Sequence, residues 1–431
     1  MFILVRKIIY TRIDDKTVKR NFLLNVFDGA VFALAMAIAA QNTVIPVYIK
    51  SIGGGSIAIA LIPVVWTIGF NFPQIFIANY ASKTGSQKNL LLVTGLFQRV
   101  FWLALAIVSF YTIPALPVEM GVIIFFTFFS LAAVGGGFNL PGWIGLISKI
   151  TPVNLRGRLF AWRVALGAIF GVLGGYIVKY ILEHLPAPHN YSLLFLISFL
   201  ITMISYAILF FIKEENTAGK PGVSNYYEYF KYLPVVLKEN KNFRNFLIGD
   251  VTMILAYTSF AFFTIDAIQR FSLNDSSAGE FTMIIMFGMI TGSLLFGYLA
   301  DHYGHRINLL LTSMFTLMAC LLALLSPTVE VYYMVFIFMA FTQSLIQVSR
   351  LTIVAEMCSE EELPIYAALT NILTVPFILT GILAGWLAQL FGFALVFIIS
   401  SAVSLFALAW YYKKVEEPRS INSFSLVTKN N

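Results

Sequence analysis

Three ionisable residues lie inside long apolar stretches of the sequence, where a charge is costly. Asp28 stands about 8 residues, or roughly 12 Å, into the first of these stretches. Asp250 lies at a similar depth in the seventh stretch, and Arg99 lies near the middle of the third. A buried carboxylate can take up and release a proton, whereas arginine stays charged. We therefore interpret Asp28, Asp250 and Arg99 as candidate functional residues. The alternative is that both aspartates cap or latch the nearer helix ends.

Amide and phenol side chains are scattered through the same apolar stretches. Such groups can hydrogen-bond a solute, and they also hold membrane helices together, so each allows both interpretations. Gln343 and Gln347 are four residues apart and therefore share one face of a helix. The candidate solute-binding residues are Gln41, Asn42, Asn139, Tyr257, Gln343, Gln347 and Asn371.

The composition of the chain indicates a membrane protein. Of its 431 residues, 59% are hydrophobic and 11% are charged, and the mean hydropathy is +0.84. Soluble domains carry roughly 25% charged residues. Backbone polar groups in hydrocarbon need internal partners, which leaves helices or closed barrels, and these apolar runs lack the alternation of barrel strands. We therefore predict an all-α membrane protein with the lipid bilayer as its surroundings.

Twelve apolar stretches are long enough to cross a bilayer, which takes roughly 20 residues. We predict transmembrane helices at residues 21–45, 57–80, 89–113, 118–147, 158–182, 191–212, 245–269, 279–300, 307–326, 330–354, 364–390 and 393–412.

The basic residues predict the orientation. Nearly all of the 28 Lys and Arg residues fall on one side of the membrane if both termini are cytoplasmic. We expect a multi-pass protein of the cell (inner) membrane, with an N-tail at 1–20 and a C-tail at 413–431. The long connection at 213–244 separates six spans from six and contains an aromatic-rich stretch. We interpret it as a cytoplasmic linker with a short amphipathic helix on the membrane surface.

The two sets of six spans, 21–212 and 245–412, repeat each other. Residues 20–23 and 244–247 both read Arg-Asn-Phe-Leu and open the first span of each set. A second match, at one constant offset, pairs Ala81, Gly85 and Asn89 with Ala300, Gly304 and Asn308. Parallel repeats of six spans are found in transporters, with the substrate site between the repeats near the bilayer midplane. We therefore predict two pseudo-symmetric six-helix halves.

The connection between predicted spans 8 and 9 carries a distinctive motif. Residues 297–306 read Gly-Tyr-Leu-Ala-Asp-His-Tyr-Gly-His-Arg. This resembles the signature loop G-x-L-a-D-r-x-G-r-r of the major facilitator superfamily, whose glycines permit a tight reversal. The equivalent loop at 79–88 is degenerate, with Ser82 where the family has Asp. The resemblance covers about residues 21–412 and implies the twelve-helix fold of that superfamily, with spans 1, 4, 7 and 10 around the cavity and spans 3, 6, 9 and 12 at the periphery. It thereby implies that Asp28 and Asp250 are candidate groups for coupling to a cation, and that Arg99 is a partner for a carboxylate or for helix-end carbonyls.

The resemblance also implies a gate on the cytoplasmic side. In the family the loop Asp latches the opposite half, so we expect Asp301 to face Arg156 and Arg158, where a helix N-terminus also favours a carboxylate. At the mirror position we expect a latch of reversed polarity, between Lys83 with Lys88 and Glu360–Glu362. The other interpretation is that these are solvated loop charges. The expected gate residues are Gly297, Asp301, Gly304, Arg306, Arg156, Arg158, Lys83, Glu361 and Glu362.

Together these features predict a secondary active transporter that moves a small molecule by alternating access. The coupling ion would be a proton or sodium, or absent. Few fixed charges and many aromatic residues, among them 41 Phe, favour export of an amphipathic or apolar molecule. Three alternatives remain: uptake of a neutral solute such as a sugar or nucleoside, a lipid flippase on the same fold, and a receptor that does not transport.

Other kinds of chemistry find little support in the sequence. A P-loop lysine motif is absent, and the glycine run at 135–137 lies inside a span rather than after a strand. His302 and His305 have no nearby cysteines with which to bind a metal. The net charge of +7 sits between apolar runs, as expected of a membrane protein rather than a nucleic-acid binder. We expect a monomer without enzymatic activity, cofactor, metal or nucleic-acid partner.

Overall fold

The computed structural model describes residues 16–215, 236–359 and 362–420. The elements in these ranges are helices, and twelve helical segments are long and apolar enough to span a membrane. Every predicted span is present, which confirms the all-α, twelve-helix fold class. The surface helix expected near residues 226–232 lies outside the described residues.

Contacts divide the chain into two compact units, residues 1–40 with 65–224 and residues 41–64 with 225–431. These units differ from the predicted halves over residues 41–64, so the boundaries of the halves stay a prediction. The helices of the first unit are α2 (Lys16–Ile38), α5 (Gln87–Ile107), η1 (Val108–Thr112), η2 (Ile113–Ala115), α6 (Val118–Ile150), α7 (Val153–His184) and α8 (His189–Phe211). Those of the second are α3 (Val44–Ser51), α10 (Lys241–Tyr257), η3 (Thr258–Ala261), α11 (Phe263–Arg270), α12 (Ser277–Tyr303), α13 (His305–Leu325), α14 (Val329–Glu356), α15 (Leu363–Ile378), α16 (Thr380–Phe391) and α17 (Phe393–Lys414). The helix α4 (Ser56–Lys83) contributes to both units.

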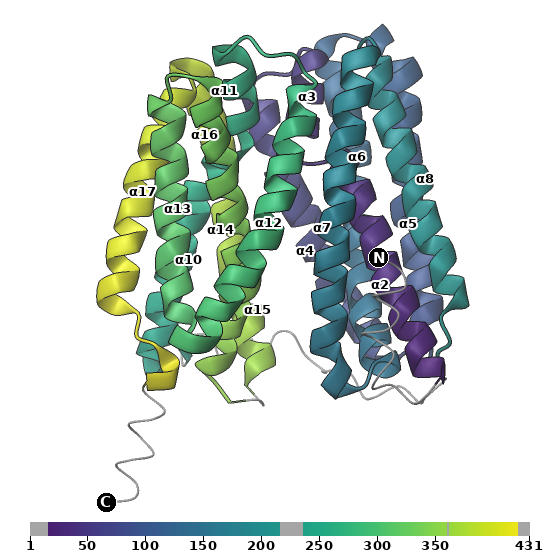
Figure 1. The fold of residues 1–431 in the computed structure, drawn as a ribbon, viewed down its shortest axis with the longest axis vertical. Helices are drawn as coiled ribbons and strands as arrows, with labels where there is room; N and C mark the ends of the chain where they lie inside the picture. Colours follow the sequence, from purple (N-terminus) through teal and green to yellow (C-terminus); the bar gives the residue numbers. More distant parts are fainter. Residues whose placement is uncertain (1–15, 216–235, 360–361, 421–431) are drawn as a thin grey trace, which may run out of the picture. The chain divides into compact units, whose positions relative to one another are not determined.

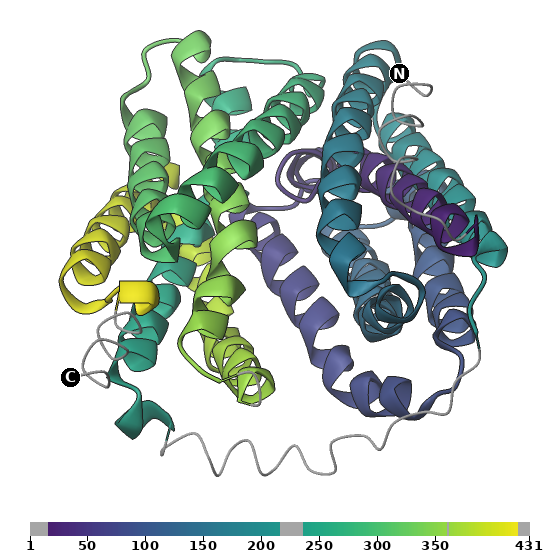
Figure 2. The same ribbon diagram turned by 60° about the horizontal axis from the view of Figure 1, so that its bottom comes forward.

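In the first unit, α2 packs along α7 and α8, and α5 packs against α6 and α8 (Figure 2). Small residues allow the closest approach. A Cβ atom added to Gly174 of α7 would lie 2.8 Å from the Cβ of Ala37 and 3.0 Å from the carbonyl oxygen of Leu34. Small residues have the same role in many membrane helix pairs. This packing brings the polar residues of α2 within reach of α7 and α8.

In the second unit, α13 packs between α14 and α17, and α10 packs against α17 (Figure 1). Gly249 of α10 lies in close contact with the ring of Tyr411 of α17. A Cβ atom at this position would lie 2.2 Å from the tyrosine ring, so a larger residue would not fit. The apolar core around this contact includes Phe243, Phe246 and Leu369.

Spans 1, 7 and 11 are broken helices, whereas the sequence predicts continuous ones. Span 1 stops at Ile38 and resumes at Val44, span 7 is interrupted at 258–262, and span 11 breaks at Leu379. The break in span 1 falls on the polar run Gln41, Asn42 and Thr43, whose side chains compete for backbone hydrogen bonds. Irregular backbone at membrane depth is tolerated where protein or water satisfies it.

The internal repeat is visible in two pairs of equivalent contacts. The amide of Asn21 donates to the carbonyl of Lys213 at 2.7 Å, and the amide of Asn245 donates to the carbonyl of Lys414 at 2.7 Å. Each contact joins the first span of its set to the end of the sixth. In the second pair, carboxylates that follow these ends accept backbone N–H groups at 2.8 Å, Glu214 from Gln87 and Glu417 from Arg306.

The signature loop needs its second glycine for two reasons. Gly304 separates α12 from α13 with a φ of 84°, a left-handed conformation that side chains disfavour. In addition, a Cβ here would come within 2.2 Å of the carboxyl carbon of Glu417. Gly297, the first glycine, has open space around it.

Candidate functional site

Asp28 is buried in the first unit, with 6% of its surface exposed. Its Oδ1 atom accepts a hydrogen bond from the hydroxyl of Ser205 on α8 at 2.6 Å, and its Oδ2 atom lies 3.2 Å from Nη1 of Arg163 on α7. The packing of α2 along both helices positions the carboxylate between these partners. The group predicted from the sequence is therefore ion-paired within its own unit.

Arg163 occupies a notch on α2. Its Nη1 atom also donates to the carbonyl and side-chain oxygens of Asn25. A Cβ on Gly29 would come within 2.5 Å of its Cζ atom, so glycine leaves the room it needs. The guanidinium lies 4.8 Å from the ring centroid of Trp143. Among the described residues, Nε and Nη2 have no hydrogen-bond partner.

Arg99 is one of the largest fully buried side chains of the protein, with 2% exposed. Its Nε atom donates to the carbonyl of Thr202 at 2.8 Å and its Nη1 atom to the carbonyl of Gly95 at 2.8 Å. The Nη2 atom lies 3.4 Å from the hydroxyl of Ser205, which itself donates to Asp28. Arg99 therefore reaches two carbonyls directly and the carboxylate through one hydroxyl.

A cavity of about 280 Å³ lies beside these three charges. Its polar lining comes from Asp28, Arg99, Arg163, Gln98, Asn139 and Ser205. Its apolar walls come from Phe32, Phe70, Leu91, Leu140, Trp143 and Leu209. Asn139, a predicted solute-binding residue, accepts a hydrogen bond from Thr94 at 3.1 Å. The first unit thus holds a space with apolar walls and charged groups on its lining.

The second unit contains its own buried ion pair. Arg350 of α14 donates from Nε to both oxygens of Asp250 at 3.0 Å and from Nη2 to Oδ2 at 2.8 Å. Its Nη1 atom donates to the side chain of Asn371 at 3.2 Å. The side chain of Asp250 is 8% exposed. Two predicted residues, Asp250 and Asn371, therefore share one guanidinium.

The breaks of spans 1 and 7 meet inside the second unit. Thr264, at the start of α11, donates to the carbonyl of Asn42 at 2.6 Å. The hydroxyls of Thr43 and Thr282 lie 2.5 Å apart, and both residues are almost fully buried. The predicted residues Gln41 and Asn42 lie in the first break, and Tyr257 is the last residue of α10 before the second. Gln343 and Gln347 lie on α14, the first half-buried and the second exposed.

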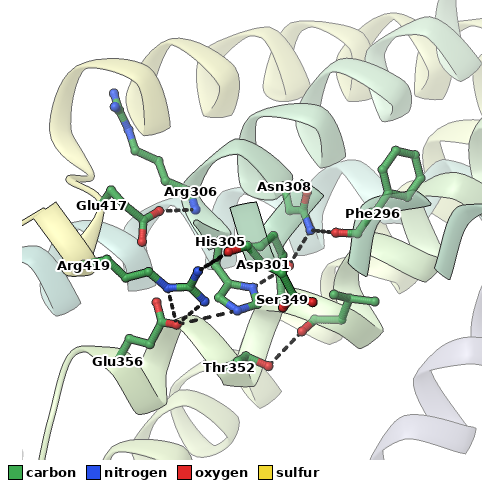
Figure 3. Close-up of polar contacts among 12 residues, drawn as sticks. Phe296, Asp301, His305, Arg306, Asn308, Ser349, Thr352, Glu356, Glu417 and Arg419 are labelled. Atoms are coloured by element: carbon green, nitrogen blue, oxygen red, sulfur yellow. Dashed lines mark hydrogen bonds and ion pairs between the residues drawn. The ribbon is translucent and has the colours of Figure 1, made fainter. Parts of the chain in front are cut away.

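The end of the second unit near the signature loop carries a polar cluster (Figure 3). Glu356 of α14 accepts two hydrogen bonds from Arg419, at 2.7 and 2.8 Å, and lies 3.7 Å from Nε2 of His305. Arg419 also donates to the carbonyls of Ala300 and Asp301 at 3.0 and 3.1 Å. His305 is the first residue of α13 and is buried, whereas the sequence places it in the loop.

Of the predicted gate residues that the structure describes, some form hydrogen bonds within their own unit and others are exposed or half-buried. Arg156 donates to the carbonyls of Ser148 and Thr151 at 2.7 and 3.2 Å, at the end of α6. Glu362 accepts from the backbone and side chain of Ser359. Arg306 donates to the carbonyl of Tyr412 at 2.7 Å. Lys83 and the Asp301 side chain are exposed, Arg158 is half-buried, and Glu361 lies outside the described residues. Both expected latches would join the two units and stay predictions.

Glu214, just after the sixth span, accepts hydrogen bonds from the N-terminal end of α5. Its carboxylate accepts the backbone N–H groups of Gln87 and Lys88 at 2.8 Å and the hydroxyl of Ser86 at 3.0 Å, and it pairs with Lys149 at 3.1 Å. Burial raises the pKa of Glu214, but these hydrogen bonds outweigh burial and the net pKa lies below its ordinary value.

Comparisons with known proteins agree with this architecture. The family model of the Major Facilitator Superfamily matches residues 246–426. An uncharacterised MFS-type transporter of Methanocaldococcus jannaschii is 23% identical over 302 residues, which cover 68% of this chain and 69% of the relative. Among solved structures, the nucleoside transporter NupG has a TM-score of 0.71 at 12% identity, and covers 92% of this chain and 100% of its own. A D-xylose-proton symporter has a TM-score of 0.69 at 14% identity, with 94% and 99% covered.

These findings first define a class, a multi-pass membrane protein with the twelve-helix transporter fold. The family match and the curated relative then indicate one family: residues 246–426 match the model of the Major Facilitator Superfamily, and the relative is described as an MFS-type transporter. These similarities favour a transporter over an enzyme.

Proposed function

We propose that the chain is a secondary active transporter that moves a small amphipathic molecule by alternating access, with a proton carried at Asp28. The proposal rests on the cavity of the first unit, where a solute-sized space and a buried carboxylate adjoin. A solute bound there changes the electrostatic surroundings of Asp28, and protonation of Asp28 changes the binding of the solute. By linkage the two effects are equal, which is what coupling requires.

The broken spans supply parts that can move. The contacts of Thr43 with Thr282 and of Thr264 with Asn42 join short polar groups, which can exchange their partners for water at small net cost. We propose that these contacts form and open during the cycle. The membrane orientation with cytoplasmic termini, the monomeric state and the preference for export remain predictions from the sequence.

A second candidate is the uptake of a neutral solute. The amides of Gln98 and Asn139 line the same cavity and can hydrogen-bond hydroxyl groups. Two proteins with the same fold are described as a nucleoside transporter and a D-xylose-proton symporter. A neutral solute would use these amides and leave the two guanidiniums without a new partner.

Proton movement in proteoliposomes tests the proposal. Liposomes carrying an internal pH dye receive drug-like amphiphiles, organic acids, sugars, nucleosides or lysolipids one at a time. We expect at least one amphiphile to drive proton movement, and Asp28→Asn to bind it without moving protons. Binding without flux for any solute would contradict transport and favour a receptor, whereas flux unchanged in Asp28→Asn would contradict the role of Asp28.

A further inference from the structure

The cavity of the first unit holds more positive than negative charge. Its lining includes two guanidiniums, Arg99 and Arg163, and one carboxylate, Asp28. Asp28 pairs directly with Arg163. The direct partners of Arg99 are two backbone carbonyls and one hydroxyl, although it is 2% exposed. A buried charge in a membrane protein is costly without a close opposite charge, so a second anion here would be stabilising.

The cavity also contains unused hydrogen-bond donors. The amide of Gln98 makes no hydrogen bond among the described residues, although the residue is 3% exposed and its Oε1 atom is fully buried. The Nε and Nη2 atoms of Arg163 are likewise without a partner in the part of the chain that the structure describes. The Nε2 atom of Gln98 and these two guanidinium nitrogens are therefore free to donate to a ligand, whereas the buried Oε1 atom of Gln98 could only accept from one. A carboxylate can accept from several of them at once.

The apolar walls and the volume of the cavity determine the body of the ligand. Phe70, Leu140 and Trp143 give the cavity large apolar surfaces. A volume of about 280 Å³ is at the lower end of ligand pockets, and at roughly 30 Å³ per water it suits a molecule of on the order of ten non-hydrogen atoms. The ligand therefore combines one negative charge with a small apolar body.

We propose that this cavity binds a small amphipathic carboxylate, with its head between Arg99 and Arg163 and its apolar body against Trp143. The inference deepens the proposed function and rests on it, because it names the substrate class of the same cavity. The charged groups that line the cavity with Asp28 are Arg99 on α5 and Arg163 on α7. The ligand carboxylate and the Asp28 carboxylate would lie in the same small cavity and repel each other, so on this proposal the ligand enters together with a proton and both move in the same direction.

A matched acid and amide test the charge requirement. Phenylacetate and phenylacetamide have similar shape and differ in charge. Each is titrated into the purified full-length protein at pH 6.5, with binding measured by calorimetry and by the rise in melting temperature. We expect phenylacetate to bind saturably and phenylacetamide to bind at least about tenfold more weakly. Chloride at equal ionic strength should not raise the melting temperature. Equal binding of acid and amide, or an equal effect of chloride, would overturn the inference.

Variants locate the site. Arg99→Gln should weaken phenylacetate binding about tenfold or more, whereas Arg244→Gln removes an exposed charge at the start of α10 and should leave it unchanged. Arg99 is buried, so its loss endangers the fold and a second variant is needed. Gln98→Glu places a carboxylate in the cavity where the ligand head would bind, and it should weaken phenylacetate binding. Asp28→Asn removes the negative charge and should tighten binding. Wild-type affinity in a folded Gln98→Glu protein would overturn the proposal.

The binding assay tests the carboxylate site and the flux assay tests the transport function, so each can give a negative result without the other. Binding of phenylacetate without flux of any solute would keep this inference and contradict the transport function. Flux of a different solute without phenylacetate binding would keep the transport function and overturn the carboxylate site.

Discussion

Arg350 binds both carboxylate oxygens of Asp250, whereas Arg163 reaches Asp28 through a single atom. The first pair has three contacts of 2.8 to 3.0 Å, and the second has one of 3.2 Å. Bidentate pairing of guanidinium with carboxylate is among the strongest charge-assisted contacts in proteins. The pair in the second unit is therefore suited to a structural role. Asp28, with a single contact to its arginine and a cavity beside it, is the carboxylate that we propose for coupling.

The pair of Asp250 and Arg350 predicts a large loss of stability when one partner is removed. Arg350→Met leaves a buried carboxylate without its guanidinium, a change that typically costs about 3–5 kcal/mol. The double variant with Asp250→Asn removes both charges and should recover part of that loss. Thermal unfolding in detergent measures both, with Arg244→Met as the exposed control. A double variant less stable than Arg350→Met would contradict the pairing.

Gly304 predicts a position-specific effect of adding one methyl group. Gly304→Ala places a side chain at a φ of 84° and against Glu417, so it should destabilise the protein by at least about 1 kcal/mol. Gly297→Ala, in open space on α12, should be neutral or slightly stabilising, because alanine is the better helix former. Melting temperatures of the two variants make the comparison. Equal effects would show that neither the backbone conformation nor the contact with Glu417 matters.

Glu214 predicts an acid-dependent loss of stability. Its folded-state pKa lies below its ordinary value of 4.5, so the stability it contributes is present above that value. That contribution is lost as the pH falls from about the ordinary value through the lower folded-state pKa. Glu214→Gln should therefore lower the melting temperature at pH 7 and show a smaller difference from wild type at low pH. The exposed neighbour provides the control, Glu215→Gln, and a constant difference between Glu214→Gln and wild type at every pH would contradict the account.

Sequence reasoning found the spans because a bilayer imposes a simple length and composition rule. It also singled out Asp28 and Asp250, because a carboxylate within an apolar run stands out; both are buried in the structure, and their role in coupling stays a prediction. It missed their partners, Arg163 and Arg350. Both arginines lie near predicted helix ends and count as cytoplasmic charges when orientation is assigned. Arg163 lies 135 positions from Asp28 in the sequence, and Arg350 lies 100 positions from Asp250. Only the packing of the helices brings each pair into contact.

The broken helices were missed for a different reason. Span length and hydropathy continue across Gln41, Asn42 and Thr43, so a composition rule extends the helix through them. The structure breaks there, and Thr264 of another span satisfies the carbonyl of Asn42 that the break leaves without a helical partner. The polar run itself was a usable signal. So was the repeat, since Glu214 and Glu417 both follow a sixth span and cap equivalent helices.

Closing the contact between Thr43 and Thr282 covalently tests alternating access most directly. In a background with Cys320→Ala and Cys358→Ser, the variant Thr43→Cys with Thr282→Cys places two thiols where hydroxyls lie 2.5 Å apart. The solute with the largest thermal shift is followed into proteoliposomes, with the single variant Thr43→Cys as control. Oxidation should stop flux in the double variant alone, and reduction should restore it. Full flux through protein with a complete disulfide would contradict alternating access.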